Sequence, residues 1–203
     1  MAERHGAMRT KSTSAKWTGI SATLHLPQNV IVHPQGSSKA SYVDWYLGMG
    51  NEVVEAGISR TNSGYKCFLG TGSDKGGKYQ SVPVSLQDGG TVNLKLVNNG
   101  NNTISLFMNS TEIHKNFPVA PGRLGTYDIV KMVHGVHDNG NNSYSQARFT
   151  NVQLRSNTSG SVYVPWDASV GHTYERVHIT KPDGGDNFTG YSAVPLSTSL
   201  SAK

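Results

Sequence analysis

Apolar and polar side chains alternate in the stretch that decides the fold, YVDWYLGM at residues 42–49. Apolar side chains occupy the odd positions from Val43 to Met49, whereas Tyr42, Asp44 and Tyr46 occupy even positions. Successive side chains of a β-strand point to opposite faces of the sheet. The stretch therefore predicts a strand with one face packed in the core and the other free to bind a ligand.

Two more strands are expected directly after this one. In EVVEAGIS at 52–59 the core face is formed by alternate apolar residues, Val54, Ala56 and Ile58. Parity in an unbulged strand then places Glu52 and Glu55 on opposite faces. A turn-rich loop leads into YKCFL at 65–69. Three short strands with tight connections predict an antiparallel meander.

The same patterns predict strands on both sides of the meander. Before it we expect strands at 20–26 and 30–32, and after it a hairpin whose strands, 91–96 and 103–108, flank the turn residues 98–102. Further strands are expected at 129–136, 147–154, 161–164 and 174–179. Nine or ten short strands with repeated turn signals predict an all-β, two-sheet antiparallel jelly-roll sandwich with little or no helix.

Composition agrees with an all-β chain. The protein has 203 residues, of which 23 are glycine and only 15% are charged, against about 25% in an ordinary soluble domain. We predict one sandwich domain over 17–191. Residues 1–16 lack apolar periodicity and read as a flexible arm, and the Ser-rich residues 192–203 read as a flexible tail.

Several classes of protein are excluded by composition. No apolar run approaches the ~20 residues that cross a membrane, so no membrane insertion is expected. Cys67 is the only cysteine, which forbids an internal disulfide, and within a strand it is expected to be a buried, inert thiol. The net charge is +5, but no basic stripe with interleaved aromatic residues accompanies it, so no nucleic-acid partner is expected.

The order of the elements resembles the concanavalin A-like lectin and glucanase sandwiches. The resemblance is carried by the stretch 41–48, by EAGI at 55–58, by 65–69 and by the hairpin at 92–108, and it covers roughly residues 18–154. The protein is also similar in strand order to a secreted Bacillus protein of unknown function. The resemblance implies a curved sheet whose concave face binds glycans in many relatives, and a location outside the cell or at its surface, with the leader absent from this chain; a cytoplasmic location stays open.

The polar face of the meander supplies the chemistry that sugar binding needs. Aromatic planes cover the apolar side of a pyranose, and fixed polar groups bind its hydroxyls. The candidate glycan-binding residues are Tyr42, Asp44, Tyr46, Glu55, Tyr65 and Trp166. Trp166 follows a predicted strand and is either a ligand platform or a core residue, whereas the parity of Trp45 places it in the core.

A catalytic role for the same face has less support in the sequence. Glycosidases hold two carboxylates across the scissile bond, but the Glu-x-Asp-x-x-Glu run of the sandwich glucanases is absent. Asp44 and Glu55 can form an acidic pair only if the strand register brings them together. No residue is assigned as catalytic from the sequence.

Metal binding has weak candidates only. The loops that contain Asp138, Asp183 and Asp186 are rich in oxygen donors, which calcium prefers, but they lack the EF-hand spacing. His134 and His137 diverge on a strand, so they do not predict a zinc site. No cofactor is expected, with calcium as the possible exception.

The sequence thus favours a non-catalytic, lectin-like module that binds a carbohydrate or another cell-surface polymer. Two alternatives stay open: a polysaccharide hydrolase or lyase that uses an acidic pair on the concave face, and a structural or assembly protein that binds no glycan. The identity of the glycan and the oligomeric state are not determined by the sequence.

Overall fold

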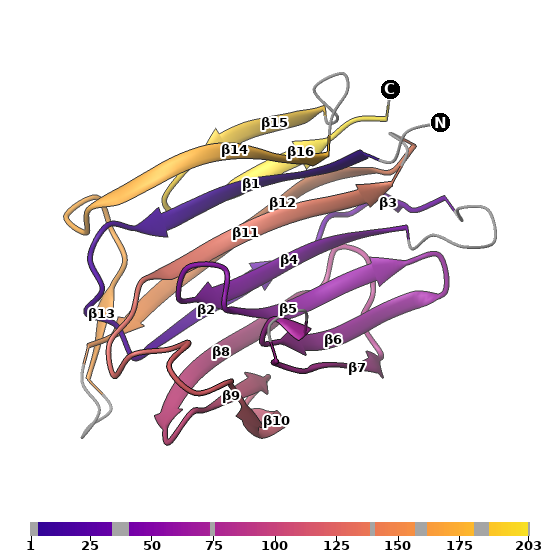
Figure 1. Ribbon diagram of the computed structural model, residues 1–203. Helices are drawn as coiled ribbons and strands as arrows, with labels where there is room; N and C mark the ends of the chain where they lie inside the picture. Colours follow the sequence, from indigo (N-terminus) through magenta and orange to yellow (C-terminus); the bar gives the residue numbers. More distant parts are fainter. Residues whose placement is uncertain are drawn as a thin grey trace.

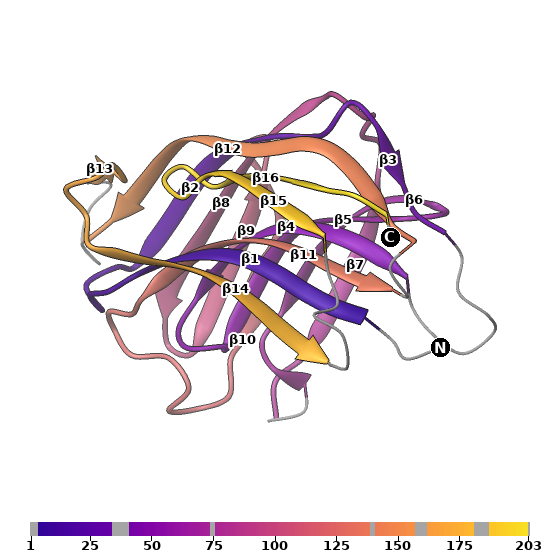
Figure 2. The same ribbon diagram turned by 90° about the horizontal axis from the view of Figure 1, so that it is seen from above.

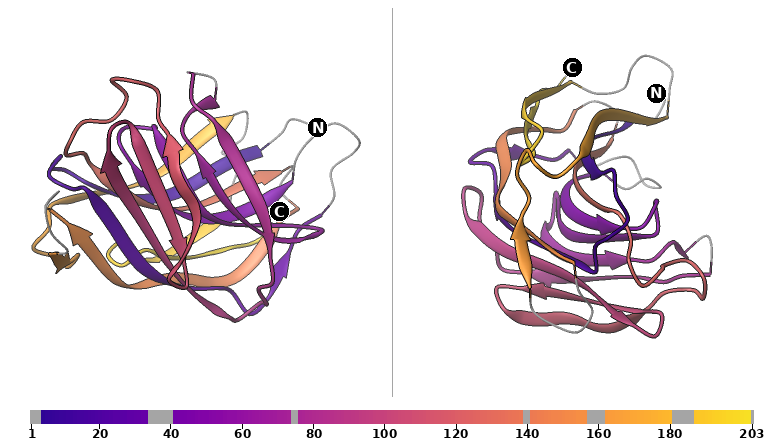
Figure 3. Two further views of the ribbon diagram at one scale, coloured as in Figure 1. Left: turned by 90° about the horizontal axis from the view of Figure 1, so that it is seen from below. Right: turned by 90° about the vertical axis from the view of Figure 1, so that its left-hand side faces the viewer.

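The computed structural model describes residues 4–33, 41–73, 76–138, 141–156, 162–180 and 187–202. These residues form sixteen strands in two antiparallel sheets, stacked as a sandwich (Figure 1). The two layers are visible edge-on in the right-hand view of Figure 3. The predicted all-β sandwich is confirmed. No helix among the described residues has the length and apolar character needed to cross a membrane.

One sheet has seven strands, four of which lie side by side in Figure 2 as β14, β1, β11 and β4. Its full order is β14 (His172–Thr180), β1 (Arg4–Ser12), β11 (Val130–Asp138), β4 (Tyr42–Met49), β5 (Val54–Thr61), β6 (Gly64–Gly70) and β7 (Tyr79–Val84).

The other sheet has nine strands. Its main path is β10 (Thr111–Pro118), β9 (Thr103–Met108), β8 (Thr91–Gly100), β2 (Gly19–His25), β12 (Ser143–Arg155), β16 (Ser197–Leu200) and β15 (Phe188–Ser192). Two short strands, β3 (Val30–Ile31) and β13 (Tyr163–Pro165), also pair with β12.

The predicted meander lies in the seven-stranded sheet as β4, β5 and β6. Trp45 stands opposite Ile58, which stands opposite Cys67, and all three side chains are fully buried between the sheets. Burial raises the pKa of the Cys67 thiol to about 12, so the thiol stays protonated and inert. The even positions of β4 face outward, as the alternation predicts.

The N-terminal prediction was wrong, because residues 4–12 form β1 in the interior of a sheet rather than a flexible arm. β1 pairs with β11 on one side and with β14 on the other. Its buried positions include Gly6, Met8, Thr10 and Ser12, which are mostly small or polar. The Thr10 hydroxyl donates a 2.5 Å hydrogen bond to the carbonyl of Ala193, and the Ser12 hydroxyl accepts one of 3.1 Å from the amide of Val130. Buried hydroxyl groups of β1 are satisfied by hydrogen bonds, so the strand has no apolar alternation by which a sequence pattern could detect it.

The prediction of a flexible C-terminal tail was also wrong. Residues 197–200 form β16, in which Thr198 is fully buried and Leu200 nearly so. Three other strands were not predicted, namely β7, β10 and β15. β7 is an edge strand that contains Pro83, a residue that sheets tolerate at their edges. The pairing of β10 with β9 has two register shifts, which disrupt its alternation.

Candidate functional site

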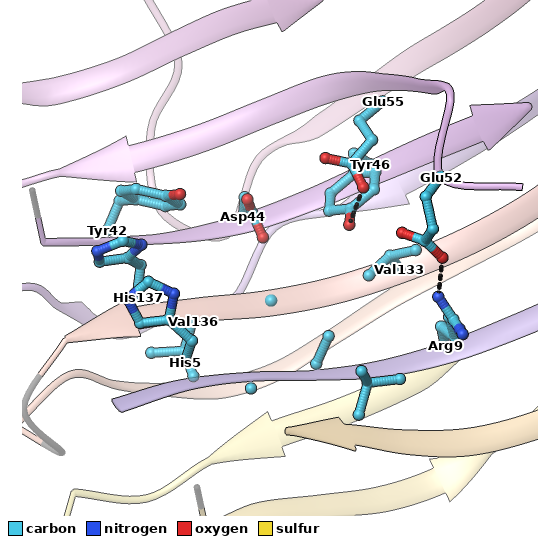
Figure 4. A pocket seen from close by; sticks show the side chains of 14 residues that line it. His5, Arg9, Tyr42, Asp44, Tyr46, Glu52, Glu55, Val133, Val136 and His137 are labelled. Atoms are coloured by element: carbon cyan, nitrogen blue, oxygen red, sulfur yellow. Dashed lines mark hydrogen bonds and ion pairs between the residues drawn. The ribbon is translucent and has the colours of Figure 1, made fainter. Parts of the chain in front are cut away.

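The outer face of the seven-stranded sheet carries a hollow of about 350 Å³, called the cleft here (Figure 4). Side chains from β1, β4, β5, β11 and β14 and from the turn before β5 line it, among them His5, Arg9, Tyr42, Asp44, Tyr46, Glu52, Glu55 and His137. The cleft therefore collects four of the six predicted site residues.

Asp44 lies over a backbone that has no side chain of its own. The register pairs Asp44 with Gly135 of β11, and a Cβ at Gly135 would collide with Oδ1 of Asp44. Gly57 on β5 makes similar room for Tyr46, since a Cβ there would collide with the backbone of β4. The two glycines let both side chains lie close to the sheet.

The Asp44 carboxyl is protonated at neutral pH. Its Oδ1 atom is buried and, among the described residues, has no hydrogen-bond partner. Burial raises the pKa of Asp44 to about 8, with a contribution from the negative charge of Glu55, while the nearby backbone amide of Gly135 and the charge of Lys131 oppose the shift. A protonated carboxyl in a cleft can donate a proton or a hydrogen bond to a ligand.

Glu55 has one fixed oxygen and one open oxygen. Its Oε1 accepts hydrogen bonds from the Tyr46 hydroxyl at 3.0 Å and from Nζ of Lys131 at 3.2 Å. Its Oε2 receives no hydrogen bond from the part of the chain that the structure describes. Burial and the nearby carboxylates raise the pKa of Tyr46 well above its ordinary value, so its hydroxyl keeps the proton that it donates. Glu55 is thus oriented through one oxygen and can accept a proton at the other.

A chain of ion pairs supports this arrangement. Lys131 is only 1% exposed, and its ammonium lies 3.2 Å from both Glu52 and Glu55. Glu52 also pairs with Arg9, which in turn donates a hydrogen bond of 2.7 Å to Glu175. Burial alone would raise the pKa of Glu52, but the charges of Lys131 and Arg9 outweigh it and lower the pKa. Glu52 is therefore firmly ionised.

The parity prediction for Glu52 and Glu55 was wrong, because both face the cleft. β5 begins only at Val54, and Glu52 lies in the preceding turn with a left-handed φ of 59°. The alternation of a strand does not apply to a residue in such a turn.

The register also decides how Asp44 and Glu55 are related. Asp44 stands opposite Ser59, and Glu55 stands opposite Gly48, so the two backbones are about 14 Å apart along the strands. The Tyr46 side chain lies between them (Figure 4). The two acids are therefore not a directly opposed pair, although both line the cleft.

An aromatic and imidazole cluster closes one end of the cleft. His137 stacks on Tyr42 with ring centroids 5.0 Å apart, and His5 stands opposite His137 in the register. His134 diverges from His137 as predicted and lies fully buried in the core, where its Nδ1 is 2.8 Å from the Thr198 hydroxyl. Burial lowers the pKa of His134 to about 3.

Two predicted site residues lie in the core instead of the cleft. Tyr65 has the parity of the buried face of β6, is 6% exposed and donates a 2.6 Å hydrogen bond to Asp88. Trp166 is 3% exposed and belongs to the core cluster, so of the two roles expected for it, ligand platform or core residue, it has the second. Both are corrected here to structural residues.

The calcium candidates lie largely outside what the structure describes. Asp183 and Asp186 fall outside the described residues, and only the backbone of Asp138 is placed, as the last residue of β11. Among the described residues, no group of three His, Cys, Asp or Glu side chains is arranged to hold a metal ion.

A second hollow, of about 330 Å³, continues from the cleft. Glu52 and Glu55 line both hollows, and Tyr79 of β7 lines the second with an exposed ring stacked on Phe68. The two hollows therefore form a continuous surface suited to an extended ligand.

Solved structures of other proteins share this architecture. No family model and no curated protein matches the sequence. Scytalido-glutamic peptidase, solved with a transition-state analog inhibitor, superimposes with a TM-score of 0.61 at 11% identity, and a second structure of it, with a peptide-based analog, gives 0.60 at 12%. SCP-B, a member of the eqolisin family solved with the tripeptide Ala-Ile-His, gives 0.50 at 13%. Each comparison covers 98% of both chains.

The fold is that of these glutamic peptidases. The likeness spans nearly the whole chain, including the N-terminal and C-terminal strands that the sequence did not predict. The sandwich of antiparallel sheets implied by the concanavalin-type resemblance is present, whereas no match supports the similarity to the secreted Bacillus protein. Identities of 11–13% establish the fold alone.

The close approach of Asp44 to Gly135 can be tested by adding a methyl group at residue 135. Gly135→Ala should destabilise the protein by about 1–3 kcal/mol, because the new Cβ collides with Oδ1 of Asp44. The loss should be largely relieved in Gly135→Ala/Asp44→Ala, in which the colliding oxygen is absent. Urea unfolding of the four proteins measures this coupling, and a Gly135→Ala loss that is the same with and without Asp44 would contradict the arrangement.

Proposed function

We propose that the cleft is the active site of an acid–base hydrolase, with Asp44 as the general acid and Glu55 as the general base. The proposal is carried by one observation: a protonated carboxyl with an unpartnered oxygen shares a cleft with an oriented carboxylate that has an open oxygen. A buried, protonated carboxyl near a second carboxyl group that is fixed by hydrogen bonds is typical of acid–base sites.

The reaction follows from these protonation states. Glu55 accepts a proton from a water molecule at Oε2, and the oxygen of that water attacks the electrophilic carbon of the scissile bond. The bond to the leaving group breaks, and Asp44 gives its proton to the leaving nitrogen or oxygen. Transfer of the proton from Glu55 to Asp44 through solvent restores the starting state. The Tyr46 side chain lies between the two acids (Figure 4), and the scissile bond would lie above it in the cleft.

The substrate class is an extended polymer, and polypeptide is the first candidate. Two adjoining hollows share Glu52 and Glu55, which suits a chain that continues past the reacting bond. The solved structures with this fold hold a peptide-based analog and a tripeptide. A polysaccharide remains the second substrate class to assay, since a glycosidic bond is also cleaved by paired carboxyl groups.

A second candidate function is non-catalytic glycan binding in the same cleft. It is favoured by the placement of Tyr42, Asp44 and Tyr46 together along one wall. In this case Asp44 would donate a hydrogen bond to a sugar hydroxyl and no bond would break.

Turnover distinguishes the two functions. We expect the protein to release new amino termini from unfolded casein, or reducing ends from a polysaccharide panel, at a rate that falls at least about 100-fold in Asp44→Asn and in Glu55→Gln. The matched control is Glu112→Gln on β10 of the other sheet, which should keep full activity. Activity should fall as the pH rises through about 8, where Asp44 loses its proton.

The remaining outcomes contradict part or all of the hydrolase proposal. Binding of a polysaccharide without product, weakened by Tyr46→Ala, supports the glycan-binding candidate instead. Turnover that Asp44→Asn leaves intact overturns the assignment of the acid. A properly folded protein that neither binds nor cleaves any of the polymers contradicts both functions.

A further inference from the structure

The other sheet carries several cationic side chains on its outer face, bordered by Glu112 of β10, which stands opposite Phe107. Its four adjoining strands β9, β8, β2 and β12 contain no Asp or Glu, whereas they contain Lys95, Arg148 and Arg155. This surface, called the basic face here, consists of the residues of these strands that point away from the core. It lies on the opposite side of the sandwich from the cleft, and its strands can be followed in the left-hand view of Figure 3.

The register aligns the basic face across the strands. Lys95 stands opposite Ser21, which stands opposite Gln153, and Arg148 stands opposite His25. Burial and the positive charge of Arg148 both lower the pKa of His25, so the field of the arginine reaches the neighbouring strand. Arg148 and Arg155 of β12 stand opposite His25 and Gly19, six residues apart on β2, which corresponds to about 20 Å along the strands. The cations therefore form a long strip rather than a single point.

A hollow of about 300 Å³ is set into this strip. It is lined by Thr23, Asn93, Lys95, Phe107, Ser110 and Asn151, among others. The Lys95 ammonium lies 4.1 Å from the centre of the Phe107 ring. Asn151 is exposed and has a left-handed φ of 50° at a bulge of β12, which aims its side chain differently from its neighbours. The hollow thus offers hydroxyls, amides and one cation.

We propose that the basic face binds an acidic polysaccharide, with a uronic acid unit in this hollow. Hydroxyl and amide groups suit the hydroxyls of a sugar, and the ammonium of Lys95 suits its carboxylate. Arg148 and Arg155 lie where further carboxylates of the chain would pass. The proposal is independent of hydrolysis in the cleft, since the two surfaces lie on different sheets.

The face is less suited to a nucleic acid. Single-stranded nucleic acids bind to aromatic platforms on which successive bases stack. The hollow has one aromatic ring among its lining residues, and Lys95 lies over that ring. The amide and hydroxyl lining instead matches the edge of a sugar.

Affinity electrophoresis or calorimetry with polygalacturonate tests the proposal on the full chain. Binding should weaken about tenfold in Lys95→Glu and in Arg148→Glu, and more in the double variant, and it should fall as salt is raised to about 0.5 M. Fully methyl-esterified polygalacturonate, which lacks the carboxylates, should bind at least tenfold more weakly. Lys78→Glu, an exposed lysine before β7 of the other sheet, gives the same change in net charge and should leave binding unchanged.

Four results would overturn the proposal. The first is equal affinity for polygalacturonate and its methyl ester, and the second is a loss of affinity in Lys78→Glu as large as that in Lys95→Glu. The third is binding of a random-sequence DNA duplex as tight as that of polygalacturonate. The fourth is no binding of polygalacturonate at low salt by the folded wild type. Circular dichroism and the unfolding midpoint of each variant show whether a loss of binding reflects the face or the fold. A cleft assay on the same variants should show unchanged turnover, which separates failure of this proposal from failure of the hydrolase.

Discussion

Replacing Asp44 with asparagine is expected to make the protein more stable than the wild type at pH 8, by an amount that grows from pH 5 upward. The folded pKa of Asp44 is about 8, whereas an unfolded aspartate has a pKa near ~3.9. Between these values the native state holds a proton that the unfolded chain releases. Stability contributed by Asp44 is therefore fully present below about pH 4 and is lost as the pH rises toward 8.

The size of the effect follows from the linkage relation. One proton difference changes the free energy of unfolding by about 1.4 kcal/mol per pH unit. The difference between Asp44→Asn and wild type should thus grow by about 3–4 kcal/mol from pH 5 to pH 8 and then level off. His134, whose pKa is lowered to about 3, has the opposite sign: its contribution is present above about pH 6.5 and is lost as the pH falls. Both proteins contain His134, so its effect cancels in the difference.

Urea unfolding at four pH values, followed by tryptophan fluorescence, measures this difference. Ser59→Ala changes the residue opposite Asp44 on β5 without changing a titrating group, and it should retain the pH dependence of the wild type. A stability difference between Asp44→Asn and wild type that does not change with pH would show that Asp44 is ionised in the native state.

Neutralising both carboxylates around Lys131 should cost more than the sum of the single changes. Glu52→Gln and Glu55→Gln each leave the buried ammonium one partner, so each should cost about 1 kcal/mol. The double variant leaves a charge that is 1% exposed without either of its anions, and such a charge costs about 3–5 kcal/mol. The excess over additivity reports the burial of Lys131.

A third substitution separates this electrostatic effect from a loss of packing. Adding Lys131→Met to the double variant removes the unpaired charge and keeps the apolar stem, so most of the lost stability should return. Urea midpoints of the single, double and triple variants at pH 7 give the complete cycle. Strictly additive losses, or a triple variant less stable than the double, would contradict a buried and paired lysine.

The strands that the sequence predicted are those whose buried faces are apolar. The alternation of β4 and β5 identified their buried faces, because Val43, Trp45, Leu47 and Met49 all fill the space between the sheets. β1 lacks this signal, since its buried positions include small and hydroxyl-bearing residues whose hydrogen bonds satisfy them. β16 is similar, because the fully buried Thr198 is held by the Tyr144 hydroxyl at 2.7 Å.

The candidate site was predicted only where it lies on one meander. Tyr42, Asp44, Tyr46 and Glu55 come from β4 and β5, so alternation alone placed them on one face. Arg9, His5 and Lys131 come from β1 and β11, whose pairing with each other and with β4 depends on long-range topology. The prediction for Tyr65 was wrong because its side chain has the parity of the buried face of β6. No local pattern signals that a glycine such as Gly135 leaves room for a carboxyl.

The position of β1 has a consequence for how the chain is made. β1 is an interior strand, and its two neighbours, β11 and β14, are synthesised about 120 to 170 residues after it. Until then both edges of β1 are unpaired, so the sheet that carries the cleft closes only after β11 and β14 have been made. Since Arg9 and His5 are on β1, the cleft is completed only when these long-range pairs form. A nascent chain stalled before residue 130 would therefore contain the meander but no complete site, which makes the appearance of function a late event in biogenesis.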